Sequence, residues 1–65
     1  MPMSPIEIIR MALDREKDAV RDYTEYAKTA EDPSIREMFL FLAGEEKKHV
    51  RLLQAEVEKE VYQEM

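Results

Sequence analysis

Gly44-Glu45-Glu46-Lys47-Lys48-His49-Val50 is the stretch of sequence around which the rest of this chain is organised. It places the carboxylate of Glu46 three residues before the only histidine, His49, in a strongly helical context. Side chains three residues apart lie on one face of a helix. The surrounding apolar residues occupy the same face, so the pair is predicted to lie in a core.

The length of the chain allows one small domain, residues 1–65. A chain this short buries too little apolar surface to be comfortably stable alone. It contains no cysteine, which excludes disulfides, thiolate zinc sites and rubredoxin-type iron centres. Oligomerisation, or a metal site built from carboxylates and histidine, remains as the source of extra stability.

The charge of the chain is acidic, with fifteen Asp and Glu against ten Lys and Arg and a formal net charge of −5. A nucleic-acid partner is therefore not expected. The sequence has neither a run of about 18 apolar residues nor a basic and then apolar leader, so we expect no membrane span and no signal peptide. A cytoplasmic protein is the expectation.

The first predicted helix covers residues 5 to about 30. Ser4 and Glu7 form a capping box around Pro5 at the first helical position. No Gly or Pro interrupts the helix, and its residues follow spacings of three and four that define an amphipathic stripe. The stripe is apolar or aromatic except for Glu16 at its centre, and it comprises Ile6, Ile9, Leu13, Glu16, Val20, Tyr23, Ala27 and Ala30.

A turn at about 31–33 separates this helix from a second one, predicted from about 33 to 62. Asp32 can cap the second helix, with Pro33 at its first position. The short turn predicts an antiparallel helical hairpin. The inner face of the second helix is again apolar with a polar interruption, and we assign to it Ile35, Met38, Phe39, Leu42, Glu46, His49, Leu53 and Val57.

The three polar stripe residues are predicted to lie at one level of the hairpin. Glu16 lies sixteen residues before Asp32, whereas Glu46 and His49 lie fourteen and seventeen residues after it. At about 1.5 Å per residue these positions are roughly 24, 21 and 26 Å from the turn. Glu16 is therefore level with the Glu46–His49 pair.

Two carboxylates and an imidazole in an apolar seam cost several kcal/mol per ion unless something compensates, and a bound cation is the simplest compensation. Oxygen and imidazole ligands suit iron, manganese or zinc. One hairpin leaves the stripe half uncovered and supplies too few ligands for two ions. A homodimer would form a four-helix bundle whose four carboxylates balance two divalent ions. Because the half-sites lie at mid-helix, we expect an isologous dimer with its turns at opposite ends.

These residues resemble the ferritin-like di-iron domain of rubrerythrins, and specifically one half of that internally duplicated bundle. Glu16-x-x-Ala19-x-x-x-Tyr23 is similar to the first-helix signature of the family. The second-helix signature is similar to Phe39-x-x-Leu42-Ala43-x-x-Glu46-x-x-His49. The resemblance covers almost the whole chain. Encapsulated ferritins also form their metal site between two short chains, but those chains are longer, and we expect no shell-targeting tail after Glu60.

The resemblance implies a bridged di-iron centre, with two iron ions per dimer, that oxidises Fe(II) or reduces oxygen or peroxide. Glu16 and Glu46 would be carboxylate ligands, His49 a terminal ligand, and Tyr23 a neighbour of the ligands. Manganese or zinc could substitute for iron. Because the chain has no cysteine module to deliver electrons, a peroxidase cycle would need an external electron donor.

Other interpretations of the same residues remain open. Glu46 and His49 could be a polar pair at the rim of a coiled coil, and Glu16 could set the register of a helical seam. The chain would then be a structural or interaction hairpin that dimerises without metal. Glu45, four residues from His49, is a rival ligand that we interpret as a solvated or access-route carboxylate.

Overall fold

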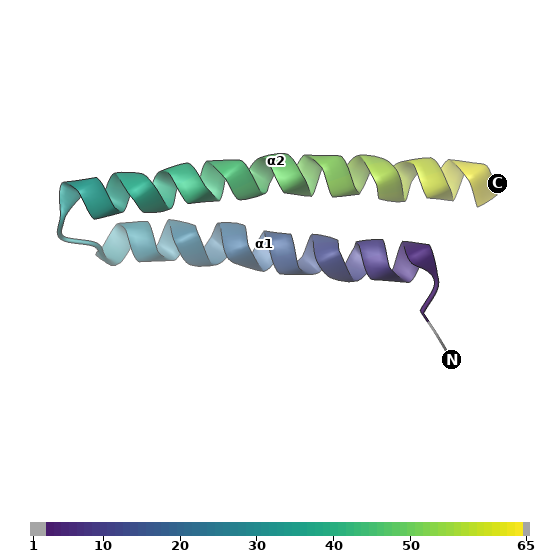
Figure 1. Ribbon diagram of the computed structural model, residues 1–65, viewed down its shortest axis with the longest axis horizontal. Coiled ribbons are helices and arrows are strands. Elements are labelled where there is room, and N and C mark those ends of the chain that lie inside the picture. The colour runs from purple at the N-terminus through teal and green to yellow at the C-terminus, as the bar shows by residue number, and fades with distance from the viewer. Residues whose placement is uncertain (1–2, 65) are drawn as a thin grey trace.

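The computed structural model describes residues 3–64, with side chains described as far as Glu60, and it contains two α-helices joined by a short turn. α1 spans Pro5–Thr29 and α2 spans Pro33–Glu64 (Figure 1). The helices run antiparallel, and the connection lies at the opposite end of the molecule from both termini (Figure 1). The all-α helical hairpin predicted from the sequence is confirmed.

The capping box at the start of α1 is present as predicted. The Ser4 hydroxyl accepts a hydrogen bond of 3.3 Å from the backbone N–H of Glu7, and the Glu7 carboxylate accepts one of 3.0 Å from the backbone N–H of Ser4. Two backbone donors at the helix start therefore have partners. α1 ends at Thr29, one residue earlier than predicted, because Ala30 has an extended backbone with φ −73° and ψ 122°.

The turn is held by side chains from both sides. Asp32 Oδ1 accepts hydrogen bonds from the Ser34 hydroxyl and from the backbone N–H groups of Ser34 and Ile35. These bonds stabilise the ionised form and lower the pKa of Asp32. Arg36, in the first turn of α2, donates two hydrogen bonds of 3.0 and 3.3 Å to the carbonyl of Ala30. The end of α1 is thus tied to the start of α2.

α2 continues to Glu64, two residues beyond the predicted end near 62. No glycine or proline follows Gly44, and the last turns are rich in glutamate, lysine and glutamine, which favour helix. α2 has 32 residues and α1 has 25, so α2 is seven residues longer. Among the described residues, no helix is long and apolar enough to cross a membrane.

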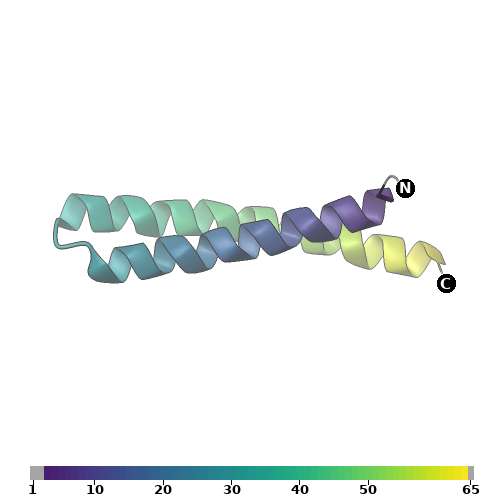
Figure 2. The same cartoon turned by 90° about the horizontal axis from the view of Figure 1, so that it is seen from below.

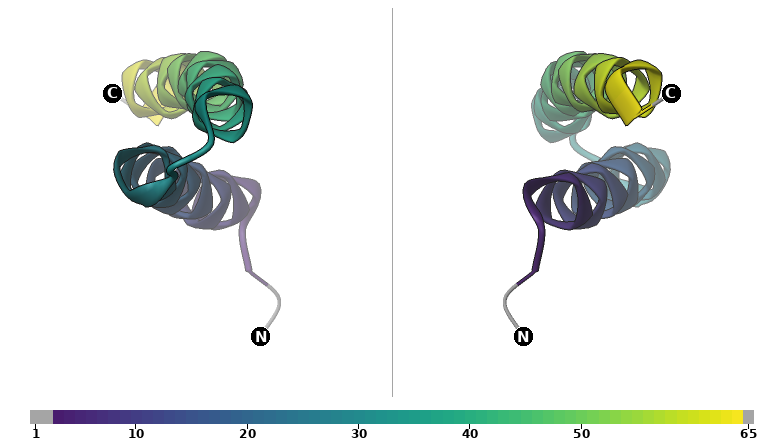
Figure 3. Two further views of the ribbon diagram at one scale, coloured as in Figure 1. Left: turned by 90° about the vertical axis from the view of Figure 1, so that its left-hand side faces the viewer. Right: turned by 90° about the vertical axis from the view of Figure 1, so that its right-hand side faces the viewer.

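The core is a thin seam between the two helices. Leu13, Ala27 and Ala43 are buried in it. The α1 stripe from Ile6 to Ala30 was assigned correctly, since every member is buried or half-buried. The two helices cross one above the other (Figure 2), and the end-on views show a single pair of ribbons (Figure 3).

The assignment of the inner face of α2 was partly wrong. Ile35 and Met38 are 43% and 49% exposed, whereas Ala43 and Val50 are buried or half-buried against α1. α1 covers only one side of the apolar stripe of α2, the side that carries Ala43. The other side of the stripe remains exposed in a single hairpin, and it includes His49.

Candidate metal centre

Glu16, Glu46 and His49 come together at one point of the hairpin. One ligand atom from each residue can be chosen so that all three atoms lie within 4.8 Å of one another. The Nδ1 atom of His49 lies 3.4 Å from Oε2 of Glu16 and 3.3 Å from Oε2 of Glu46. The residues predicted to share one level therefore do share it, although one lies on α1 and two lie on α2.

Local structure explains this convergence. Glu46 and His49 are three residues apart within the unbroken α2, so their side chains leave the helix on the same face. Glu16 lies in the middle of α1, one turn after the buried Leu13. Because α1 and α2 run antiparallel from a turn of fixed length, helical rise alone brings Glu16 level with the pair.

The burial of the three side chains is graded. The side chains of Glu46 and Glu16 are 21% and 29% exposed, whereas that of His49 is 52% exposed. The two carboxylates thus lie mostly within the seam, and the imidazole lies at its open edge. No lysine or arginine forms an ion pair with either carboxylate among the described residues.

The donor set fits a divalent transition-metal ion. Two carboxylates and an imidazole are ligands that iron, manganese and zinc accept. Three donors do not complete a coordination sphere, so additional ligands would have to come from outside this hairpin.

Tyr23 lies in an aromatic cluster on the turn side of the three residues. Its ring stacks on Phe39 at a centroid distance of 6.3 Å and meets Tyr26 edge-on at 6.4 Å. Tyr26 and Phe39 are also in contact, at 5.6 Å. No hydrogen bond links the Tyr23 hydroxyl to a described residue. A role for Tyr23 beside the ligands stays a prediction, and sequence reasoning had not foreseen the cluster that positions it.

Glu45 lies outside this group of three residues. Its carboxylate forms an ion pair of 3.0 Å with Lys48, one turn along the same helix, and its side chain is 38% exposed. The arrangement is that of a surface carboxylate beside the site. Its participation in metal binding remains a question for experiment.

Comparison with known proteins places the chain among its relatives. The family model described as Rubrerythrin matches residues 7–65, which is nearly the whole chain. The chain belongs to the rubrerythrin family. The match includes α2, α1 from Glu7 onward and all three residues of the candidate centre. No solved structure shows significant similarity to this rubrerythrin-family chain.

Three relatives illustrate the similarity. The encapsulin nanocompartment cargo protein EncB of Myxococcus xanthus is 43% identical over 42 residues, which cover 65% of this chain and 27% of that protein. A ferritin-like-encapsulin shell fusion protein of Pyrococcus furiosus is 42% identical over 45 residues, 69% of this chain and 13% of the other. An uncharacterized protein of Archaeoglobus fulgidus is 37% identical over 51 residues, covering 78% and 79% of the two chains. The rubrerythrin-family chain thus matches only a small part of the first two relatives.

Proposed function

We propose that this chain provides half of a di-iron centre, and that two copies assemble to complete it. The observation that carries the proposal is the convergence of Glu16, Glu46 and His49 within 4.8 Å. Membership of the rubrerythrin family supports iron as the metal. Two copies would supply four carboxylates and two imidazoles, enough to balance two divalent ions and to give each a histidine.

The residues of the chain have distinct tasks in this proposal. Glu16 and Glu46 would hold the ions from two different helices. His49 would supply an imidazole ligand from the open edge of the seam. Leu13 is buried beside Glu16, and the half-buried Val20, Leu42 and Leu53 extend the apolar wall that limits access of water. Iron, when bound, supplies the redox chemistry by which Fe(II) is oxidised or oxygen or peroxide is reduced.

The exposed apolar residues support a second copy on the His49 side of the hairpin. Ile8 and Met38 are 54% and 49% exposed. Ile8 lies nine residues before Lys17, and Met38 lies nine residues before Lys47. Because nine residues make two and a half helical turns, each apolar side chain points to the side of its helix opposite the lysine. Leu52, 67% exposed, lies one turn after His49 on the same side. Contact between these apolar side chains and water is unfavourable, and a partner subunit would bury them.

The spacing of these apolar residues fits a two-fold axis through the centre. Ile8 lies eight residues before Glu16, and Met38 lies eight residues before Glu46. Because the helices are antiparallel, the two residues are about 12 Å from the centre in opposite directions. A two-fold axis perpendicular to the helices would therefore place Ile8 level with Met38 of the partner subunit. This is the self-complementarity that an isologous dimer requires.

Anaerobic Fe(II) titration followed by exposure to air tests the proposal. We expect two irons per dimer and an absorption band typical of oxo-bridged ferric iron. Comparing turnover with oxygen and with hydrogen peroxide then separates ferroxidase from peroxidase chemistry. Failure of the wild-type chain to bind iron would rule the proposal out and would favour the alternative, a structural hairpin that dimerises without metal.

The names of two relatives suggest a setting for this chemistry. One is an encapsulin cargo protein and the other a fusion of a ferritin-like part to an encapsulin shell. We extend the proposal to an iron-oxidising role inside or beside such a shell. Co-expression with an encapsulin shell protein, followed by purification of intact shells, tests it. We expect co-purification of the chain, and its absence from the shells would contradict this extension.

A further inference from the structure

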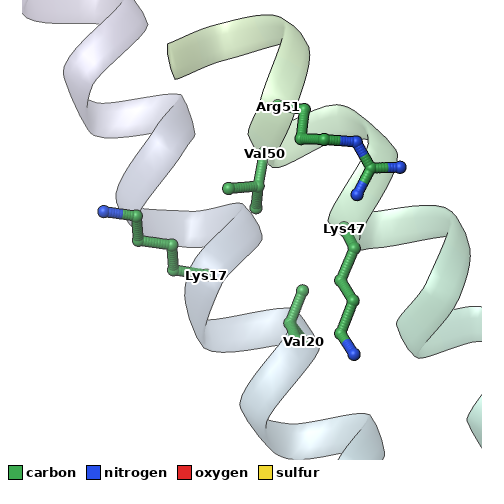
Figure 4. Close-up of a pocket in the computed structure, with 5 residues that line it drawn as sticks. All are labelled: Lys17, Val20, Lys47, Val50 and Arg51. Atoms are coloured by element: carbon green, nitrogen blue, oxygen red, sulfur yellow. The ribbon is translucent and has the colours of Figure 1, made fainter.

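Two strongly exposed apolar side chains lie on the side of α2 that faces away from α1. The half-buried Val50 points toward α1 (Figure 4). Phe41 lies nine residues before Val50 and Leu52 two residues after it, so they point about 180° and 160° away from Val50 around the helix. They are 64% and 67% exposed, the highest values among the large apolar side chains that the structure describes. Their burial would have to come from outside the hairpin.

An ion pair lies midway between these two side chains. The Glu45 carboxylate is 3.0 Å from Lys48 Nζ. Phe41 lies four residues before Glu45, and Leu52 lies four residues after Lys48. Spacings of four, three and four keep the four side chains on one side of α2, as in the seam between two packed helices. We call Phe41, Glu45, Lys48 and Leu52 the outer stripe of α2.

The outer stripe is complementary to an antiparallel copy of itself. A two-fold axis perpendicular to α2, level with the midpoint between residues 46 and 47, exchanges position 41 with 52 and position 45 with 48. Phe41 is then level with Leu52 of the partner subunit, and Glu45 with the partner's Lys48. Apolar side chains meet each other, and so do opposite charges. A parallel copy in register would instead bring like charges together.

The position of the outer stripe fits the candidate centre. His49 directly precedes Val50, so it points about 100° from Val50 and lies between the side of α2 that faces α1 and the outer stripe. A second α2 packed on the outer stripe would therefore enclose His49 between itself and α1. The level of the two-fold axis also lies between Glu46 and His49, where the two halves of the proposed centre must meet.

We propose that α2 of one copy packs antiparallel against α2 of a second copy through the outer stripe. This inference rests on the proposed dimer and assigns the helices that meet in it. Phe41 and Leu52 supply the apolar contact, and the Glu45–Lys48 pair selects the antiparallel orientation. Glu45 thereby has a task in assembly that is separate from metal binding.

Disulfide cross-linking tests the contact, because the chain has no cysteine of its own. In the double variant F41C/L52C, each introduced cysteine is level with a cysteine of the partner subunit. A bond within one chain is excluded, because the two positions are about 16 Å apart along α2. The same separation divides equivalent cysteines of two copies in the single variants F41C and L52C. With oxidised glutathione, we expect at least about ten times more covalent dimer from the double variant than from either single variant.

The double variant L40C/L52C is the matched control. Leu40 is also exposed, at 52%, but it points about 100° away from Phe41 around the helix. We expect as little covalent dimer from this control as from the single variants. Non-reducing gel electrophoresis measures the yields, for the metal-free chain and for the chain with Mn(II). If F41C/L52C gives no more covalent dimer than L40C/L52C under either condition, the proposal is wrong.

A charge reversal tests the same contact with Phe41 and Leu52 intact. Glu45→Lys places a lysine level with the partner's Lys48, twice in each dimer. At about 20 mM salt it should raise the dimer dissociation constant about fivefold or more. The reversed pair E45K/K48E restores opposite charges and should return the constant to within about twofold of the wild type. A reversed pair as weak as Glu45→Lys would contradict the proposal.

Lys28→Glu is the control for this experiment. It breaks the 3.1 Å ion pair between Glu25 and Lys28, which has the same spacing but lies on α1, so the dissociation constant should not change. Far-UV circular dichroism checks that every variant remains helical. Sedimentation equilibrium of the wild type separates this contact from the dimer itself. A wild type that dimerises while F41C/L52C fails to cross-link rejects only the contact, whereas a chain that stays monomeric with and without Fe(II) rejects both proposals.

Discussion

His49 Nδ1 lies 3.4 Å from Oε2 of Glu16, a residue thirty-three positions earlier in the chain and on the other helix. The same nitrogen lies 3.3 Å from Oε2 of Glu46 on its own helix. A histidine at the open edge of a seam, facing two less exposed carboxylates, is the arrangement that a bound cation would stabilise. The predictions below separate this interpretation from a purely structural one.

Replacing Glu16 with leucine should have opposite effects with and without metal. Without metal, Glu16→Leu removes a carboxylate that is 29% exposed in an apolar seam, so the thermal midpoint should be unchanged or raised. With Fe(II) under anaerobic conditions, the wild type should melt higher because binding contributes to folding, and the variant should lose this increase. Thermal melts with Fe(II) and with a chelator measure both effects. Equal midpoints for the loaded and chelated wild type would support the structural interpretation.

Leu52 and Leu40 form a matched pair for testing the dimer. They are 67% and 52% exposed, but Leu52 lies one turn after His49, whereas Leu40 lies nine residues before it and points to the opposite side of α2. We expect Leu52→Gln to raise the dimer dissociation constant about tenfold or more, the equivalent of about 1.4 kcal/mol. Leu40→Gln should leave it unchanged. Sedimentation equilibrium at 1 M salt gives both constants, and equal effects would contradict a dimer formed on the His49 side.

Arg36 should stabilise the hairpin by capping the end of α1. Its guanidinium donates two hydrogen bonds to the carbonyl of Ala30, which would otherwise have no helical partner. Arg36→Gln should lower the free energy of unfolding by about 0.5–1 kcal/mol, a small value because the contact is exposed. Urea denaturation measures this change. Arg10→Gln is the control, since Arg10 forms no side-chain hydrogen bond or ion pair with a described residue.

The cap at Asp32 should make stability depend on pH. Hydrogen bonds from Ser34 and from the backbone N–H of Ile35 lower the pKa of Asp32 in the folded state. The stabilising contribution is therefore complete above the unfolded pKa of an aspartate, about 3.9, and is lost as the pH falls through the lower folded pKa. Asp32→Asn can still cap the helix but cannot titrate. Urea midpoints between about pH 2 and pH 6 should fall less steeply with acid in this variant, and parallel curves would contradict the assignment.

Gly44 should be replaceable. A Cβ atom added at Gly44 meets no atom within 4 Å, and the residue lies in the middle of α2. Gly44→Ala should therefore raise the free energy of unfolding by about 1 kcal/mol through lower backbone entropy in the unfolded chain. A drop in stability that depends on protein concentration would instead show that a partner helix packs closely against Gly44.

The sequence by itself determined the elements of this fold and the level of its candidate centre. The Ser4–Glu7 capping box, the Asp32-Pro33 pair and two amphipathic stripes, each with a polar interruption, are local signals, and local signals set helix boundaries to within two residues here. Helical rise is constant, so counting residues from the turn was enough to bring Glu16 level with Glu46 and His49. Each of these conclusions needed only one-dimensional information along the chain.

Only the tertiary structure decided which side of α2 is covered by α1. The apolar stripe of α2 is wider than one helix can cover, so the sequence could not tell whether Met38 or Val50 would be buried. Packing against Ala43 and Val50 left Met38 and His49 on the open side. On the other side it formed a groove lined by Lys17, Val20, Lys47, Val50 and Arg51 (Figure 4). The contact from Arg36 to Ala30 was likewise beyond sequence reasoning, because it depends on how the two helix ends are oriented across the turn.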